Sequence, residues 1–296
     1  MKKDGFGRPF FVHAYSEFVY LCTPKIRPKK MALIQTMEAT GAKLFKYRGQ
    51  IPVLIFVLAI PVLAASFNTD LAESWYFNPT ASTLTVAIAF LTSLCGLALR
   101  AYTVSTTPKG TSGRNTASQV AYTLNTKGIY SVVRHPLYLA NYLIWLGVLI
   151  YSRNLFVIII VSLVYWIYYE RIMMAEEAYL RGKFGDEFEE WAAKVPAFLP
   201  KWSRFEGGML QFSWKTFVRR EYATWLSTVY SYLATDWILY QLWRLQMESC
   251  YGKLKGNYIT NHAAIFWIAV TYTIIALIIK LIKHKTTWLD APPDRD

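Results

Sequence analysis

Long apolar segments alternate with polar stretches along the whole sequence. Such segments cover 51–67, 80–99, 137–151, 155–169, 222–243 and 263–282. A helix crosses a bilayer in roughly 20 apolar residues, and three of these segments are close to that length. Asp236 interrupts the aromatic-rich segment 222–243, so that segment either spans the membrane or lies in its interface. The pattern predicts a membrane protein with five or six transmembrane helices.

Segments 137–151 and 155–169 are separated only by Ser152-Arg153-Asn154. So short a connection predicts a tight helical hairpin that returns the chain to the membrane surface it left. At 1.5 Å per residue each segment reaches only about 22 Å, short of the roughly 30 Å hydrocarbon core. The two helices must therefore extend beyond these boundaries or lie in a thinned bilayer.

The composition agrees with this pattern. Of 296 residues, 54% are hydrophobic and 17% are charged, and the net charge is +13. The basic residues flank the apolar segments and form no nucleic-acid-reading motif, so we assign them to membrane topology and anionic lipid rather than to RNA or DNA. We expect an all-α polytopic membrane helical bundle with a cytoplasmic helical cap, beginning at residue 170, and no Rossmann sheet.

Charge asymmetry between the connections predicts the topology. Residues 1–50 and 100–136 are strongly basic, whereas the only charged residues of 68–79 are the acids Asp70 and Glu73. By the positive-inside rule the basic regions are cytoplasmic. The first apolar segment begins too far into the chain for a cleavable signal peptide, and no C-terminal CaaX box is present. We expect a basic region 1–50, a core 51–204 and an extension 205–296.

Ionisable residues lie at both ends of the predicted hairpin. These are Arg134, His135, Tyr138, Arg171, Glu176 and Glu177. Singly, such residues are explained by snorkelling, membrane anchoring or surface ion pairs. A hairpin would bring both groups to one membrane surface, where they could form a polar site.

Several motifs carry a family resemblance. They are the stretch 123–138, which ends in Arg-His-Pro-Leu-Tyr, then Glu176-Glu177, Phe184-Gly185 and Val195-Pro196. Together they resemble the isoprenylcysteine carboxyl methyltransferase family, which is also similar to phospholipid methyltransferases. The resemblance covers about residues 95–200.

The resemblance implies an S-adenosyl-L-methionine site built from membrane helices and cytoplasmic loops. The expected cofactor-binding residues are Tyr122, Thr123, Leu124, Asn125, Tyr130, His135, Pro136, Leu137, Tyr138 and Glu176, with Asn115 a weaker candidate. Tyr122 stands where relatives often have histidine, so its backbone is the expected contact. The expected catalytic residues are Arg171, Arg134 and Glu177, and no metal site is expected.

The acceptor is expected to be an anion on a membrane lipid. A carboxylate or phosphate is already ionised and needs no general base, and arginine binds either one bidentately. The basic loop from Lys109 to Arg114 could hold phosphate, so Lys109, Arg114 and Arg171 are the expected substrate residues. The sequence is similar to bacterial enzymes of this family that methylate lipid A phosphate, which implies a bacterial inner-membrane location and a cytoplasmic active site.

Other functions stay open at this point. The acceptor could instead be an isoprenylcysteine carboxylate or the amine of phosphatidylethanolamine. Sterol reductases share an Arg-His…Tyr stretch, but they favour an Asn before the Tyr, where this chain has Leu137. A non-catalytic scaffold or a transporter is a further alternative, and Asp236 is the candidate intramembrane acid for transport.

Overall fold

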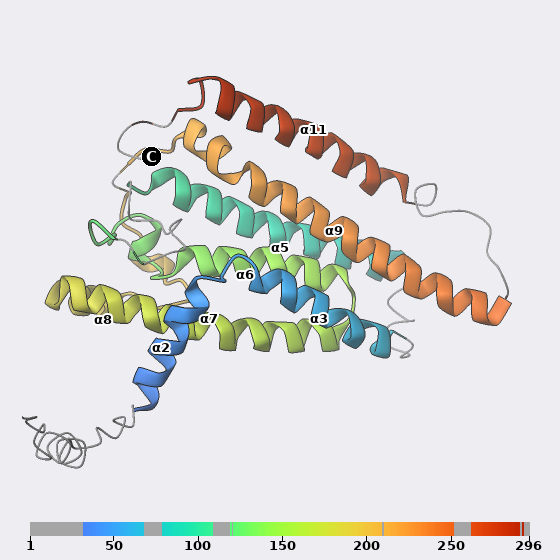
Figure 1. Ribbon diagram of the computed structural model, residues 1–296, viewed down its shortest axis with the longest axis horizontal. Helices are drawn as coiled ribbons and strands as arrows, with labels where there is room; N and C mark the ends of the chain where they lie inside the picture. The colour runs from blue at the N-terminus through green and yellow to red at the C-terminus, as the bar shows by residue number, and fades with distance from the viewer. Residues whose placement is uncertain are drawn as a thin grey trace, which may run out of the picture. The chain divides into compact units, whose positions relative to one another are not determined.

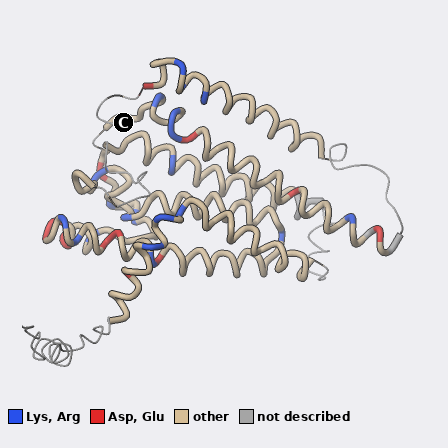
Figure 2. Tube along the Cα trace, viewed as in Figure 1, with Lys and Arg blue, Asp and Glu red and all other residues tan. Residues whose placement is uncertain are grey.

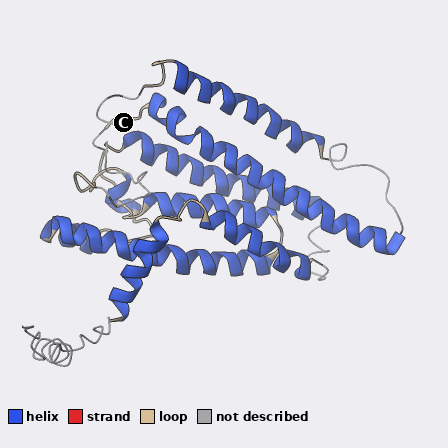
Figure 3. Ribbon diagram, in the orientation of Figure 1, coloured by secondary structure: helices blue, strands red, loops and turns tan. Residues whose placement is uncertain are grey.

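The computed structural model describes residues 32–67, 79–108, 119, 121–208, 210–251, 262–290 and 292. The chain forms two compact units, Met1–Thr36 and Met37–Asp296. Every regular element in the described ranges is a helix (Figures 1 and 3). The α-helices are α2 (Leu33–Phe45), α3 (Ile51–Ser66), α5 (Pro79–Thr106), α6 (Pro136–Tyr151), α7 (Leu155–Phe184), α8 (Asp186–Lys194), α9 (Trp214–Tyr251) and α11 (Ala263–Lys285). Two short 3-10 helices are η1 (Ile129–Ser131) and η2 (Trp202–Arg204).

The expected membrane helical bundle is confirmed. Within the described ranges, three stretches are long and apolar enough to cross a membrane: Thr83–Thr106, Leu155–Phe184 and Ala263–Lys285. The shorter apolar helices are α3 and α6. In Figure 2 the apolar stretches of α7 and α11 carry almost no charge, whereas charged residues gather along α8 and at helix ends. This distribution suits helices whose middles lie in hydrocarbon.

The predicted hairpin is confirmed, and its turn has a clear local cause. Ser152, Arg153 and Asn154 separate α6 from α7. Arg153 adopts a left-handed conformation with φ of 56°. The Asn154 side chain then caps α7, because its Oδ1 accepts a hydrogen bond from the backbone N–H of Val157 at 3.0 Å.

The expected end of the second hairpin helix at residue 169 is wrong. Helix α7 continues past Glu170 to Phe184. Its whole length is 30 residues, which is about 45 Å at 1.5 Å per residue. It ends at Gly185, whose φ of 53° an ordinary side chain would resist. The polar end of α7 and the short helix α8 therefore form the cap that was expected to start at residue 170. The length of α7 also removes the need for a thinned bilayer around this helix.

The aromatic-rich segment 222–243, which Asp236 interrupts, lies within the single continuous helix α9. This helix runs antiparallel to α11, since Tyr230 contacts Thr273 at 2.8 Å and Arg219 reaches Asp290 at 2.8 Å. Its 38 residues correspond to about 57 Å, longer than the hydrocarbon core. Asp236 accepts a hydrogen bond from Tyr151 and pairs with His262, both at 2.7 Å. The buried acid is thus part of a local polar network.

Helices α5 and α6 approach each other closely through two glycines. A Cβ added to Gly147 would lie 2.5 Å from the carbonyl oxygen of Ala89. A Cβ on Gly96 would lie 2.6 Å from the carbonyl oxygen of Ala140. Backbone atoms cannot retreat as a flexible side chain can, so only glycine fits at either position. This contact holds the start of α6, and the residues before it, against α5.

We expect Gly147→Ala to destabilise the protein by about 1–3 kcal/mol, because the new methyl group forces α5 and α6 apart. Thermal unfolding of the detergent-solubilised protein measures this. Gly182→Ala is the matched control, since nothing lies within 4 Å of its added Cβ. Alanine in that helix should be neutral or stabilising by up to about 1 kcal/mol. Equal melting temperatures for the two variants would contradict the close approach.

Candidate active site

The segment before α6 is held in place by the chain that follows α8. Backbone hydrogen bonds run from Arg134 N to Pro196 O (2.9 Å), from His135 N to Ala197 O (3.1 Å) and from Lys201 N to Val132 O (2.9 Å). The indole Nε1 of Trp191 donates to the carbonyl oxygen of Tyr130 at 3.0 Å. Since these bonds satisfy backbone groups that no helix satisfies, the loop can take one defined path.

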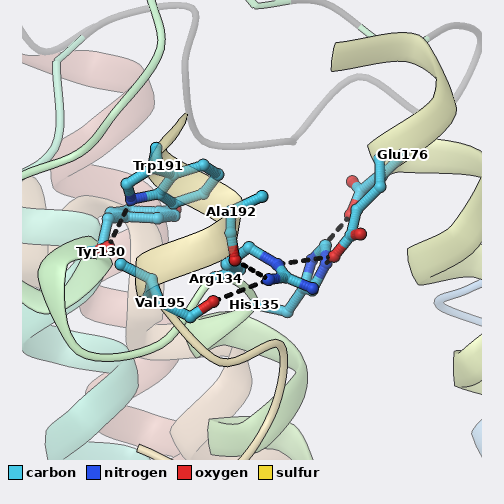
Figure 4. A network of polar contacts seen from close by, with 8 residues as sticks. Tyr130, Arg134, His135, Glu176, Trp191, Ala192 and Val195 are labelled. Atoms are coloured by element: carbon cyan, nitrogen blue, oxygen red, sulfur yellow. Dashed lines mark hydrogen bonds and ion pairs between the residues drawn. The ribbon is translucent and has the colours of Figure 1, made fainter. Parts of the chain in front are cut away.

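Arg134 is the centre of a polar network. Its Nε donates to Glu177 Oε1 at 2.8 Å, and its Nη1 donates to the carbonyl oxygens of Ala192 and Val195, both at 2.7 Å (Figure 4). Those two carbonyls belong to the end of α8, where backbone acceptors lack helical partners. One guanidinium therefore ties together α7, α8 and the segment before α6.

His135 lies between the two acids of α7. Its Nε2 is 3.0 Å from Glu177 Oε1, and its Nδ1 is 3.4 Å from Glu176 Oε2. Burial alone would lower the pKa of His135, but its hydrogen bonds to Glu176 and Glu177 and their negative charges outweigh burial and raise the pKa above 6.5. The prediction that the two ends of the hairpin meet at one polar site is confirmed for these residues.

A cavity of about 270 Å³ opens beside this network. Nine of the ten residues expected to bind the cofactor line it: Thr123, Leu124, Asn125, Tyr130, His135, Pro136, Leu137, Tyr138 and Glu176. The tenth, Tyr122, does not line it, and its side chain is 69% exposed. Residues separated by about 50 positions in sequence thus surround one space because the hairpin and the loop before it fold onto each other.

Two polar atoms of the cavity wall lack partners. Asn125 is buried, and its Oδ1 has no hydrogen-bond partner within the described part of the chain; the same holds for Nε2 of Gln119. A buried polar atom without a partner is costly, which points to a ligand or water that supplies the missing bond. Together with the Glu176 carboxylate, these groups fit a ligand that carries both cationic and hydrogen-bonding groups.

Arg48, Arg100 and Asn141 also line the cavity, and the sequence analysis missed them. Arg100 donates from Nε to Glu221 Oε2 at 2.6 Å and from Nη1 to Asn141 Oδ1 at 2.8 Å. Its position at the end of an apolar segment was read as a sign of topology. The same position was the available signal for function, since a cation inside a membrane helix usually has a partner.

The remaining expected residues are placed unevenly. Arg134 lines the cavity, whereas Glu177 and Arg171 do not. The backbone of Arg171 lies against α2, where a Cβ on Gly41 would come within 2.6 Å of its carbonyl carbon. Lys109, Arg114 and Asn115 lie outside the described residues. The functional roles assigned to all these residues stay predictions.

Comparison with known proteins agrees with this geometry. Residues 83–187 match the phospholipid methyltransferase family. This part of the chain is similar to that family. The matched part begins in α5 and ends in α8, so it contains the hairpin and most of the polar network. The resemblance noted in the sequence is confirmed.

Individual relatives are similar over stretches shorter than the family match. A protein-S-isoprenylcysteine O-methyltransferase of Schizosaccharomyces pombe is 39% identical over 77 residues, which are 26% of this chain and 33% of the relative. The cobalt-zinc-cadmium resistance protein CzcN of Cupriavidus metallidurans is 38% identical over 85 residues, 29% and 39% of the two chains. The aligned part thus spans about a third of the curated relatives. No solved structure gives a significant match.

The contacts of His135 with Glu176 and Glu177 predict that the stability of the protein depends on pH. A pKa raised in the folded state stabilises the protein fully below the ordinary value of 6.5, and that stability is lost as pH rises through the raised pKa. We expect His135→Gln to lower the melting temperature most at low pH, with the difference from wild type shrinking as pH increases. Melting curves across pH 5.5 to 9, about the range in which histidine titrates, measure this.

The matched control is His284→Gln, since His284 is exposed near the end of α11. Its melting temperature should follow that of the wild type at every pH. A constant difference between His135→Gln and wild type would show that His135 does not titrate in this range.

Proposed function

We propose that this protein is a membrane methyltransferase that binds S-adenosyl-L-methionine in the cavity beside His135 and methylates an anion on a lipid-like acceptor. The observation that carries the proposal is the cavity itself. Nine residues of the family motif surround it, and the Glu176 carboxylate and the unpartnered Asn125 amide oxygen form part of its wall. The similarity of residues 83–187 to the family supports the same chemistry.

The donor set suits this cofactor. S-adenosyl-L-methionine supplies an electrophilic methyl group on a sulfonium, and it also carries an ammonium group and a ribose diol. Glu176 can accept hydrogen bonds from the ammonium or the diol, and the Asn125 oxygen offers a second acceptor. The ring of Tyr138, stacked 5.7 Å from that of His135, provides a flat apolar surface.

Arg134 and Glu177, which the sequence analysis listed as catalytic, are better explained as positioning residues. Glu177 is engaged by both Arg134 and His135 and does not line the cavity. The pair therefore orients the His135 ring and holds α8 over the cavity. Methyl transfer is an in-line displacement, so alignment and exclusion of water are what the protein must supply.

We propose a carboxylate as the acceptor, with isoprenylcysteine as its class. The names of relatives from Schizosaccharomyces pombe and Arabidopsis thaliana favour this substrate. An amine would have to lose a proton before attack, and the three arginines in the cavity wall, Arg48, Arg100 and Arg134, favour an anion over an amine. The names of these relatives give no support to a lipid phosphate, including that of lipid A, as the acceptor. The cytoplasmic placement of the cavity rests on charge asymmetry.

The decisive experiment measures binding of S-adenosyl-L-methionine to the detergent-solubilised protein, followed by transfer of labelled methyl. N-acetyl-S-farnesylcysteine and a total lipid extract are the two acceptors. Saturable binding with label on the prenylated cysteine supports the proposal. Label on an acidic lipid alone would replace the acceptor, and an absence of binding would overturn the function.

The two adjacent glutamates should behave differently. We expect Glu176→Gln to weaken binding of S-adenosyl-L-methionine about tenfold, because its carboxylate faces the cavity, and to lower the melting temperature less than Glu177→Gln does, because its contact with His135 is the longer one at 3.4 Å. Glu177→Gln should lower the melting temperature, because it removes a charged partner from both Arg134 and His135. Glu190→Gln, on the exposed face of α8, is the control for both. Equal effects of the first two variants on cofactor affinity would contradict the assignment.

A further inference from the structure

A second cavity lies outside the part of the chain that matches the family. It measures about 250 Å³, is lined by α5, α9 and α11, and is open on one side. Its wall is mainly apolar and includes Phe90, Leu94, Leu97, Trp225, Val229 and Ile268. Helices α9 and α11 both follow residue 187, where the family match ends. The extension 205–296 thus builds most of this space.

The few polar groups of this wall are largely satisfied by protein. The hydroxyls of Ser93 and Tyr232 lie 2.8 Å apart, and Thr228 donates to the carbonyl oxygen of Thr224 at 2.9 Å. Trp225 differs, because its buried Nε1 has no hydrogen-bond partner in the described ranges. An apolar cavity with an unused buried donor fits a hydrocarbon chain that carries an isolated acceptor.

Arg100 stands between the two cavities. It lines the first cavity and follows Leu97 of the second by one helical turn on α5. On α9, Glu221 precedes Trp225 by one turn as well. The Arg100–Glu221 ion pair, at 2.6 Å, therefore lies one helical turn from the apolar cavity on both helices, and Arg100 also lines the polar cavity.

Glu221 controls the direction of the Arg100 guanidinium. This carboxylate is only 2% exposed, and it takes the Nε edge while Asn141 takes Nη1. No hydrogen bond engages Nη2 in the described part of the chain, and 23% of the Arg100 side chain remains accessible. A guanidinium held on one edge keeps its other edge for an anion.

We propose that α5, α9 and α11 form the acceptor site, with the anionic head group on Arg100 and the hydrocarbon tail in the apolar cavity. Arg100 is then a substrate-binding residue and Glu221 its positioning residue. This inference rests on the proposed function for the identity of the reaction, and it names the chemical class of the acceptor: an anion at the end of a single hydrocarbon tail. It also assigns a role to the extension.

Tryptophan quenching tests the tail site directly. The probe is stearate brominated at mid-chain, an anion with one hydrocarbon tail, added to the full-length protein in detergent. The signal of Trp225 is the difference between wild type and Trp225→Phe. Trp267, on α11 and 59% exposed, provides the matched reference through Trp267→Phe. We expect saturable quenching at Trp225 and quenching at Trp267 that rises without saturation.

Two variants separate the head group from the tail. Arg100→Gln combined with Glu221→Gln removes both charges together, so no unpaired charge is buried. The probe concentration at half-saturation should rise about tenfold. Ile268→Phe narrows the tail cavity and should raise the probe concentration at half-saturation about threefold. Ile278→Phe is the control on the same helix, since Ile278 is 51% exposed and does not line the cavity. Melting temperatures exclude misfolding.

Binding of S-adenosyl-L-methionine, measured on the same samples, separates the two proposals. Wild-type protein that binds the cofactor but shows no saturable quenching at Trp225 overturns the acceptor site alone. Protein that binds the probe but not the cofactor overturns the proposed function alone. Unchanged half-saturation in both the charge-removed variant and Ile268→Phe also overturns the acceptor site.

Discussion

The ion pairs of Arg134 and His135 with the two acids of α7 hold the functional end of this bundle together. The loop before α6 has no regular structure apart from one 3-10 turn, so its path depends on contacts with other elements. Arg134 binds one carboxylate and two carbonyl oxygens, and His135 lies between both carboxylates. These bonds act together with the backbone hydrogen bonds between the loop and the chain after α8 to hold the motif residues around the cavity.

Such a network is costly to bury and is stable only when its members are satisfied. Glu177 is bonded to two cationic groups, which leaves Glu176 as the carboxylate that faces the cavity. The two adjacent acids face different surroundings because consecutive residues on a helix point about 100° apart. One acid can then organise the site while its neighbour binds a ligand.

The C-terminal helices add a second layer to this arrangement. Helix α9 places Glu221 against Arg100, and α11 closes an apolar cavity beside it. The family match ends at residue 187, before either helix begins. A common cofactor cavity combined with a separate acceptor cavity would allow related chains to keep one reaction and change its substrate.

The sequence by itself determined the class of fold, the hairpin and nine of the residues that line the cavity beside His135. The length of the apolar segments sets where helices cross hydrocarbon, and Ser152-Arg153-Asn154 sets the turn between α6 and α7. Most of the motif residues that line the cavity lie within the single stretch 123–138. The end of α7 was misjudged because hydropathy marks where a helix leaves the membrane, whereas its hydrogen bonds continue until Gly185.

Only the tertiary structure decided the partners of Arg100 and the cavity that α9 and α11 line with α5. Arg100 and Glu221 are 121 residues apart, and no local pattern links an arginine on one helix to an acid on another. The same limit applies to Tyr122, whose motif position suggested the cavity although its side chain is exposed. Local propensity and hydropathy act over a few residues, whereas pairing between helices depends on how whole helices pack.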